Sequence, residues 1–393
     1  MQVSSGILAE LPLRQVSDSI LPLSIVDQCA PLGEKDHNEM IDSVTIQNFR
    51  GFTHLNLPRL TRFTLIGGGN NAGKSSVLEA MTICQAKTNP GIFVYLQGTR
   101  GLTELPLDPN QIWGPFFGKF DLQNPVVITQ RSGDRTEKLT MSFDGSYSPK
   151  VPTKPGPLGV PTVRADQLGT TVYALKMEAV SGNRTIHNSH FLMSASGLGV
   201  EIDLSEPVGK ASFLPSRAGS NTRDDALKFG QLDVANVGEA ILKFLKIVDD
   251  RLRGLSSVAI GNGTVLHGDI GLGKKIPIYH MGDGVVRLLN IMLCIASSPK
   301  GIVFIDEFGN GLHYSIFSRV VEAIAVAAKE YDVQIVATTH SYEFLREAHK
   351  GLAKNFENDF TYIRLDRAGD KISAKTYEYK PLAAALEQGW EVR

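Results

Sequence analysis

A glycine-rich motif between an apolar run and a helical pattern constrains this chain more than any other feature. Residues 68–75 read GGNNAGKS and fit the pattern G-x-x-x-x-G-K-[ST]. They follow the apolar run Phe63–Ile66, and a helical pattern begins near Lys74. In this strand–loop–helix context, the N–H groups of the loop and the helix N-terminus face bound phosphate groups. The motif therefore predicts a phosphate loop at residues 68–75.

The lysine and the serine of this loop have distinct expected roles. Lys74 should reach the β- and γ-phosphates of a nucleotide and act in catalysis, and the Ser75 hydroxyl should ligate Mg²⁺. We therefore expect ATP and Mg²⁺ as cofactors. The candidate nucleotide-binding residues of this segment are Gly68, Gly69, Asn70, Asn71, Ala72, Gly73, Lys74, Ser75 and Ser76.

A second motif lies much later in the chain, where residues 302–307 read IVFIDE. Four apolar residues predict a buried strand, and ligands of doubly wound sheets bind at the carboxyl ends of such strands. Asp306 is expected to hold Mg²⁺ through water. Glu307 is placed to polarise an attacking water, a role usually worth ~10²–10⁴-fold in rate. An acidic pair that only ends a core strand is the alternative, which the phosphate loop disfavours.

The hydrophobic pattern predicts an α/β fold with parallel strands. A helical period runs through Asp233–Arg253, and no sustained heptads predict a long coiled coil. Helices and strands then alternate, as in sheets with parallel strands. These later elements are a helix from about Gly284, a strand at Ile302–Ile305, a helix at about Tyr314–Lys329 and a strand at Gln334–Thr338.

We expect the chain to divide into an N-terminal extension, residues 1–40, and a nucleotide-binding head, residues 41–393. Strand patterning begins only at Ile41, so residues before it either pack on the head or precede the true start at Met40. A β-rich and helical insertion is expected at about 90–256, where the Pro- and Gly-dense stretch Ser148–Pro161 forms a loop or lid.

Composition narrows the partners and the compartment. The formal net charge of -1 gives no global attraction to nucleic acid or anionic membranes, although a local basic patch could still contact DNA. No apolar run approaches the ~18 residues of a membrane span, and no secretory signal is visible. The three cysteines show no metal-ligand spacing. We expect a cytoplasmic protein without membrane contact.

The order of the motifs adds a family resemblance. Residues 281–284, MGDG, precede a helix, and Thr339-His340-Ser341 ends a strand. This order resembles that of the ABC-type ATPases, in which a phosphate loop is followed by a long insertion, a signature helix, an acidic strand and a switch histidine. The resemblance implies an ABC-type P-loop ATPase head, an α/β fold with a mixed sheet. The opening Ile46–Phe52 and the segment Asn310–His313 are similar to the branch of RecF, SMC-like heads and the ATPase domain of OLD-family proteins.

The resemblance implies further site residues. Asn48 and Arg50 would lie near the phosphates or adenine, and His340 would contact the γ-phosphate or the attacking water. Gly282, Asp283 and Gly284 would present a helix start to the nucleotide of a partner copy. The family's glutamine at the metal is assigned to Gln111, and residues 310–313 would contact the partner.

This sequence departs from the family pattern at two signature positions. Met281 replaces the usual serine, which removes a hydroxyl contact with phosphate. Asp283 replaces the second glycine, which brings a negative charge to the same place. Both departures weaken the expectation that the signature of one copy activates another.

The resemblance also implies a function. It predicts a switch ATPase that pairs as at least a dimer and gates a nucleic-acid-linked process, in DNA repair or in a two-gene anti-phage defence system. OLD-family proteins carry a nuclease domain after the head, but residues 341–393 are too few for one, so a nuclease or toxin effector is expected on a separate polypeptide. The alternatives are the ATPase subunit of a membrane transporter and a nucleotide-dependent scaffold that hydrolyses little.

Three other groups of residues receive structural interpretations. His187 and His190 are expected in a surface loop, rather than at a metal. A core aromatic cluster is predicted from Trp113, Phe116, Phe117 and Phe120. A solvated basic face, interleaved with acids, is predicted from Arg131, Arg135, Lys138, Arg217, Arg223, Lys274 and Lys275.

Overall fold

A computed structural model describes most of the chain from residue 40 onward. The described residues are 11–12, 40–86, 89, 91–102, 104–105, 108–148, 172–194, 197–204, 210–216, 222–261, 263–353 and 355–392. Most of the expected N-terminal extension and of the 148–161 loop, together with Arg217, lies outside them. The chain forms two compact units: unit 1 includes residues 44–55 and 79–208, and unit 2 includes residues 56–78 and 209–393.

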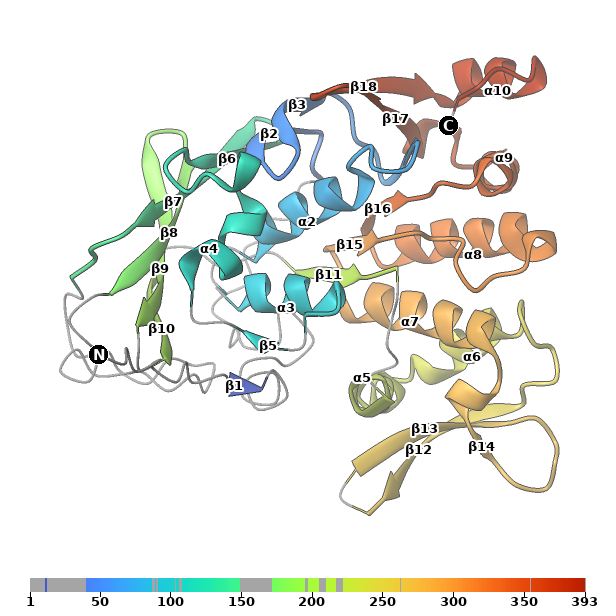
Figure 1. Ribbon diagram of the computed structural model, residues 1–393. Helices are drawn as coiled ribbons and strands as arrows, with labels where there is room; N and C mark the ends of the chain where they lie inside the picture. The colour runs from blue at the N-terminus through green and yellow to red at the C-terminus, as the bar shows by residue number, and fades with distance from the viewer. Residues whose placement is uncertain are drawn as a thin grey trace, which may run out of the picture. The chain divides into compact units, whose positions relative to one another are not determined.

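Unit 2 is built on a six-stranded sheet in the order β11-β15-β16-β4-β17-β18. Strands β11, β15, β16, β17 and β18 of this sheet are labelled in Figure 1. The first five strands are parallel neighbours, and β18 is antiparallel to β17. The strands are β4 (Phe63–Gly68), β11 (Ala211–Leu214), β15 (Ile302–Ile305), β16 (Gln334–Thr338), β17 (Phe360–Ala368) and β18 (Lys371–Glu378). The prediction of an α/β fold with a mixed sheet is confirmed. The strands expected at 302–305 and 334–338 have the predicted bounds.

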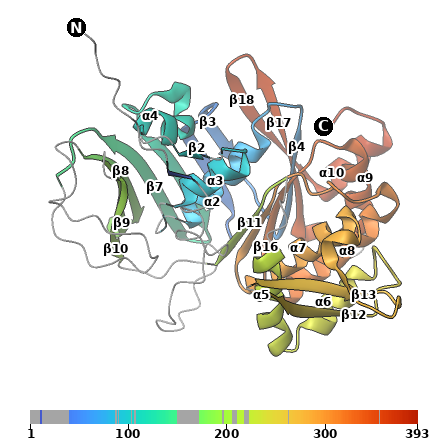
Figure 2. The same ribbon diagram turned by 60° about the horizontal axis from the view of Figure 1, so that its bottom comes forward.

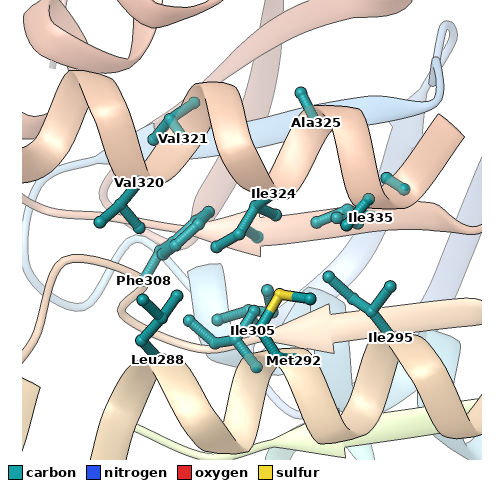
Figure 3. Close-up of a cluster of buried hydrophobic side chains, with 14 of the residues drawn as sticks. Leu288, Met292, Ile295, Ile305, Phe308, Val320, Val321, Ile324, Ala325 and Ile335 are labelled. Atoms are coloured by element: carbon teal, nitrogen blue, oxygen red, sulfur yellow. The ribbon is translucent and has the colours of Figure 1, made fainter. Parts of the chain in front are cut away.

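Helices cover this sheet and supply its core. In Figure 3, Leu288, Met292 and Ile295 project from one helix toward Ile305 and Ile324, and all five are at most 1% exposed. Burial of each such side chain contributes ~1.5–3 kcal/mol to folding. The helices are α2 (Lys74–Gln85), which passes from unit 2 into unit 1, α7 (Asp283–Ser297), α8 (Phe317–Glu330), α9 (Tyr342–Gly351) and α10 (Tyr379–Glu387).

A smaller layer of unit 2 precedes α7 (Figure 2). It contains α5 (Thr222–Val234), α6 (Gly238–Leu245) and the antiparallel strands β12 (Gly254–Ile260), β13 (Gly263–Asp269) and β14 (Ile276–Pro277). The single helix predicted over 233–253 is wrong. Asn236 adopts a left-handed backbone (φ 61°) that separates α5 from α6, and α6 ends at Leu245. The apolar spacing extends beyond the end of α6 because residues after the helix, such as Leu252, are also buried in the core.

Unit 1 is built on a seven-stranded sheet in the order β10-β9-β8-β7-β6-β2-β3. Its strands are β2 (Ser43–Phe49), β3 (Phe52–Leu57), β6 (Val126–Ser132), β7 (Arg135–Asp144), β8 (Tyr173–Ser181), β9 (Arg184–Ser194) and β10 (Gly197–Leu204). Its helices are α3 (Ile92–Thr99), α4 (Pro109–Ile112) and the 3-10 turns η1 (Gly114–Phe116) and η2 (Gly118–Phe120). A short pair joins β1 (Leu11–Pro12) to β5 (Glu104–Leu105).

Two side-chain predictions for unit 1 need correction. His187 and His190 do not lie in a surface loop, because both belong to β9 and His187 is buried within the sheet. Trp113, Phe116 and Phe117 form part of the core as expected, but Phe120 is 67% exposed. Phe120 ends the turn η2 with a left-handed backbone, φ 60°, so its side chain leaves the core.

No described helix is long and apolar enough to cross a membrane. The longest helix within the described ranges, α7, has 15 residues, which leaves no long coiled coil there. Three further 3-10 turns complete unit 2, namely η3 (Ile278–His280), η4 (Tyr314–Ile316) and η5 (Glu357–Asp359).

Candidate nucleotide-binding and catalytic site

The phosphate loop starts where β4 ends beside β17. A side chain at Gly68 would place its Cβ 2.4 Å from the carbonyl oxygen of Leu365, and φ is 134°, so only glycine fits there. The loop then turns through Asn71, whose φ is 59°, and α2 begins at Lys74. Arg367 donates from Nη1 to the Asn71 carbonyl oxygen (3.2 Å). The sequence did not reveal this second anchor of the loop.

Lys74 is held inside the loop by backbone carbonyls. Its Nζ donates to the carbonyl oxygens of Gly68 (3.0 Å) and Gly69 (3.1 Å), and the residue is only 7% exposed. Burial lowers the pKa of Lys74, while the charges of Glu307 and Asp306 oppose that shift. A cation bonded only to neutral oxygens is ready to exchange them for anionic phosphate oxygens, which are stronger acceptors.

A chain of hydrogen bonds connects the phosphate loop with the acidic strand. The Ser75 hydroxyl donates to both carboxylate oxygens of Asp306, at 2.9 and 3.0 Å. The Thr338 hydroxyl, at the end of β16, donates to Asp306 Oδ1 at 2.7 Å. Asp306 is 6% exposed. A buried carboxylate beside a hydroxyl matches the hard oxygen ligands of Mg²⁺, which takes few protein ligands and completes its shell with water and phosphate oxygens.

Glu307 adopts a constrained conformation next to this chain. Its φ is 50°, a left-handed backbone that costs about 1–3 kcal/mol in a residue other than glycine. Its N–H donates to Thr338 Oγ1 (2.8 Å), and its Oε2 lies 2.6 Å from Nδ1 of His340. The predicted catalytic pair is therefore in direct contact, with His340 on the more exposed side.

Arg287, on α7, holds the backbone of the acidic pair by hydrogen bonds. Its Nη2 donates to the carbonyl oxygens of Asp306 (2.6 Å) and Glu307 (3.1 Å), and its Nη1 donates to that of Pro215 (2.9 Å). Burial lowers the pKa of Arg287 to about 10, although the Asp306 charge opposes the shift. Arg287 and Thr338, like Arg367, are functional candidates that the sequence did not identify. The available signal for Arg287 was the one basic residue of a mostly apolar helix.

The signature segment, residues 281–284, packs on the 310–313 loop within unit 2. A Cβ on Gly284 would lie 3.1 Å from the carbonyl oxygen of Gly311, and one on Gly311 would lie 3.4 Å from Asp283. Gly282 caps α7 and is exposed, as are Asp283 and Asn310. Two segments predicted to meet a partner copy thus form one continuous exposed surface.

Three predicted site residues lie in unit 1. Arg50 pairs with the buried Glu79 (Nε to Oε2, 2.7 Å), and its guanidinium lies 4.8 Å from the centre of the Phe116 ring. Burial lowers the pKa of Arg50 to about 10, while Glu79 opposes the shift. The Asn48 amide donates to the Asn124 carbonyl oxygen. Gln111 is exposed on α4. Roles in nucleotide or metal binding stay predictions for these three.

Two family models match the chain. Residues 40–170 match an AAA ATPase domain. Residues 203–346 match a family described as an AAA domain, putative AbiEii toxin, Type IV TA system. Together they contain the phosphate loop, the signature segment, the acidic pair and His340. The matches show similarity to AAA-family ATPase domains, which is consistent with the resemblance to the RecF and SMC-like branch.

Individual proteins give more distant matches. An ATP/GTP phosphatase of Helicobacter pylori is 24% identical over 363 residues, covering 86% of this chain and 95% of that protein. The uncharacterized protein MJECL10 of Methanocaldococcus jannaschii is 43% identical over 56 residues, 14% of this chain and 26% of that one. An SMC head bound to the C-winged helix domain of ScpA aligns over 88% of this chain and 99% of that one, with 12% identity and a TM-score of 0.46. The SMC head domain from Thermotoga maritima covers 86% and 99%, with 10% identity and a TM-score of 0.39.

Proposed function

We propose that this chain, an ATPase of the AAA family, is a switch that binds Mg-ATP, pairs with a second copy and hydrolyses the nucleotide. The observation that carries the proposal is the hydrogen-bonded connection from Ser75 through Asp306 to Thr338. It joins residues 68–75 to the Asp306 carboxylate, beside the Glu307–His340 contact, at the carboxyl ends of neighbouring parallel strands, where such sheets bind their ligands.

Each residue of the site has a defined task in this proposal. Lys74 exchanges its carbonyl partners for the β- and γ-phosphates. Ser75 and Asp306 hold Mg²⁺, which neutralises phosphate charge when bound. Glu307 orients the attacking water and takes up its proton, and His340 holds the Glu307 carboxylate in position.

Pairing is supported by the surface that the signature segment and the 310–313 loop form together. Backbone N–H groups at the start of α7 can contact a phosphate held by another copy. The side chains of Asp283, Asn310 and His313 are exposed on this surface, so a second head could approach it. The Asp283 carboxylate would lie near that phosphate and slow turnover.

We propose that this ATPase acts in the cytoplasm as a switch, which controls an effector on a separate polypeptide. The match of residues 203–346 to a family described as a putative AbiEii toxin supports a defence role over a general repair role. A nuclease or toxin encoded by the neighbouring gene would support this output. A membrane permease in that place would instead support a transporter subunit.

The test separates nucleotide binding from turnover. Glu307→Gln should bind Mg-ATP with the wild-type Kd, because the Lys74 and Ser75 contacts are intact, and should lose ~10²-fold or more in kcat. Glu322→Gln, the same change at an exposed position of α8, is the matched control. Wild-type turnover by Glu307→Gln would contradict the proposal, as would a wild type that binds but never hydrolyses Mg-ATP.

A further inference from the structure

Arg287 is a buried cation, and within the described part of the chain its hydrogen bonds all go to backbone carbonyls. Its three acceptors are the carbonyl oxygens of Pro215, Asp306 and Glu307. The residue is 5% exposed, so its charge has little access to water. A buried guanidinium is costly to desolvate, and a leucine or methionine of similar size would suit the mostly apolar buried face of α7 without that cost. Its presence at this position therefore requires a reason beyond packing.

The acceptors lie at a constrained point of the chain. Glu307 has a left-handed backbone, which persists only where the surroundings determine it. Thr338 holds the Glu307 N–H, and Arg287 holds the carbonyls of both members of the acidic pair. The side-chain direction of Glu307 depends on these backbone contacts, because a left-handed residue points its Cβ differently from a strand residue.

The helix that carries Arg287 also carries the signature segment. Arg287 lies one helical turn after Asp283 and Gly284, and Gly284 packs against Gly311. One rigid helix thus contacts the acidic pair through Arg287 and the 310–313 loop through its first turn. A shift of α7 when a partner copy docks would be transmitted to the Glu307 peptide by these hydrogen bonds.

We infer that Arg287 is a positioning residue, which couples the signature helix to the orientation of the Glu307 carboxylate. This inference rests on the proposed hydrolytic function. In addition, the start of α7 would contact the partner copy, and the Arg287 side chain would set the orientation of the Glu307 carboxylate.

The test compares Arg287→Met, Arg287→Lys and a control, Arg319→Met, at an exposed arginine of α8. Arg287→Met should keep the Kd for Mg-ATP within roughly threefold, because the phosphate loop is untouched, and lower kcat by about 10- to 100-fold. Arg287→Lys keeps a charge and fewer donors, so its kcat should be intermediate. In the Glu307→Gln background, Arg287→Met should lower the residual rate by less than about threefold, because both changes act through one carboxylate.

A purely structural arginine would give a different pattern. Equal losses in Kd and kcat, or a full additional loss in the Glu307→Gln background, would overturn the inference, and so would normal turnover by Arg287→Met.

Amide hydrogen exchange of the segment around 306–310, measured without nucleotide, gives a readout independent of turnover. Exchange should be faster in Arg287→Met than in Arg319→Met, and equal rates would overturn the inference. If the wild type fails to hydrolyse Mg-ATP while this exchange difference is present, the proposed function fails and the structural coupling stands.

Discussion

Nδ1 of His340 lies 2.6 Å from Oε2 of Glu307, so the strand-end histidine and the acidic residue of a neighbouring strand form one unit. This contact gives His340 a role before any nucleotide arrives, because it restrains the Glu307 carboxylate. The histidine is 55% exposed at its side chain and Glu307 only 18%, which leaves the other ring nitrogen available to a phosphate or a water.

Removal of that restraint should reduce turnover with little change in affinity. We expect His340→Ala to lower kcat by about 10-fold or more, because Glu307 loses its orienting partner. His340→Gln, which can still donate a hydrogen bond, should retain more activity than His340→Ala. Steady-state kinetics beside a binding titration tests this, with His54→Ala at an exposed position of β3 as control. An unchanged kcat in His340→Ala would remove His340 from the mechanism.

Loss of the loop lysine should abolish binding itself. Lys74→Ala removes the cation that the loop carbonyls hold, and no other side chain donates to those carbonyls among the described hydrogen bonds. We expect no saturable binding of Mg-ATP in Lys74→Ala by calorimetry, and normal binding in Lys243→Ala, an exposed lysine of α6. Lys74→Ala with wild-type affinity would show that the loop binds nucleotide by its backbone alone.

Self-association should restore activity between complementary mutants. An arginine at Gly284 would collide with the Gly311 carbonyl and block the signature surface, whereas Lys74→Ala damages the phosphate loop. Each mutant alone should be inactive. When the two are mixed, each heterodimer should contain one intact site, made of the phosphate loop of one copy and the signature segment of the other. A mixture of Lys74→Ala with Ser75→Ala, both on the same loop, should stay inactive. Turnover independent of concentration, from a protein that light scattering finds monomeric, would end the pairing model.

The stability of unit 2 should depend on pH through Asp225 of α5. Burial raises the pKa of Asp225 from 3.8 to about 6, so between these values the folded protein binds more protons than the unfolded chain. The contribution of Asp225 to the free energy of unfolding therefore falls as pH rises through that window. Asp225→Asn should raise the melting temperature more at about pH 7.5 than at about pH 5. The control, Asp370→Asn in an exposed turn, should change the melting temperature equally at both pH values. An equal change at both pH values in Asp225→Asn would contradict the prediction.

A chain that starts at Met40 should fold and bind Mg-ATP. The backbone N–H and carbonyl of Ile41 both bond to the Gln334 side chain, at 2.9 and 2.8 Å, which ties the start of the head to β16. Circular dichroism and a nucleotide titration check this. Insolubility or lost binding would mean that residues 1–39 are part of the head.

The sequence by itself determined the elements whose signals are local. The two motifs could be predicted from their own residues and near neighbours, because the turn geometry of glycine and the burial of an apolar strand act over a few positions. These motifs are residues 68–75 and 302–307. The strands at 302–305 and 334–338 followed from short apolar runs. Local signals failed at Asn236, which separates α5 from α6, and after Leu245, where the apolar spacing continues beyond the end of α6. They also failed for Phe120, whose left-handed backbone directs its side chain out of the core.

Only the tertiary structure decided which distant residues meet. The order β15-β16-β4 brings Thr338 and Ser75 to Asp306, and β17 brings Arg367 to the phosphate loop. Arg287 is the only basic residue of α7, and nothing local to the sequence indicates that its side chain reaches the carbonyl oxygens of Asp306 and Glu307. A local pattern carries no information on strand order, since that order is selected by the burial of whole faces against one another. The tertiary contacts therefore decide which side chains orient the residues that the motifs identify.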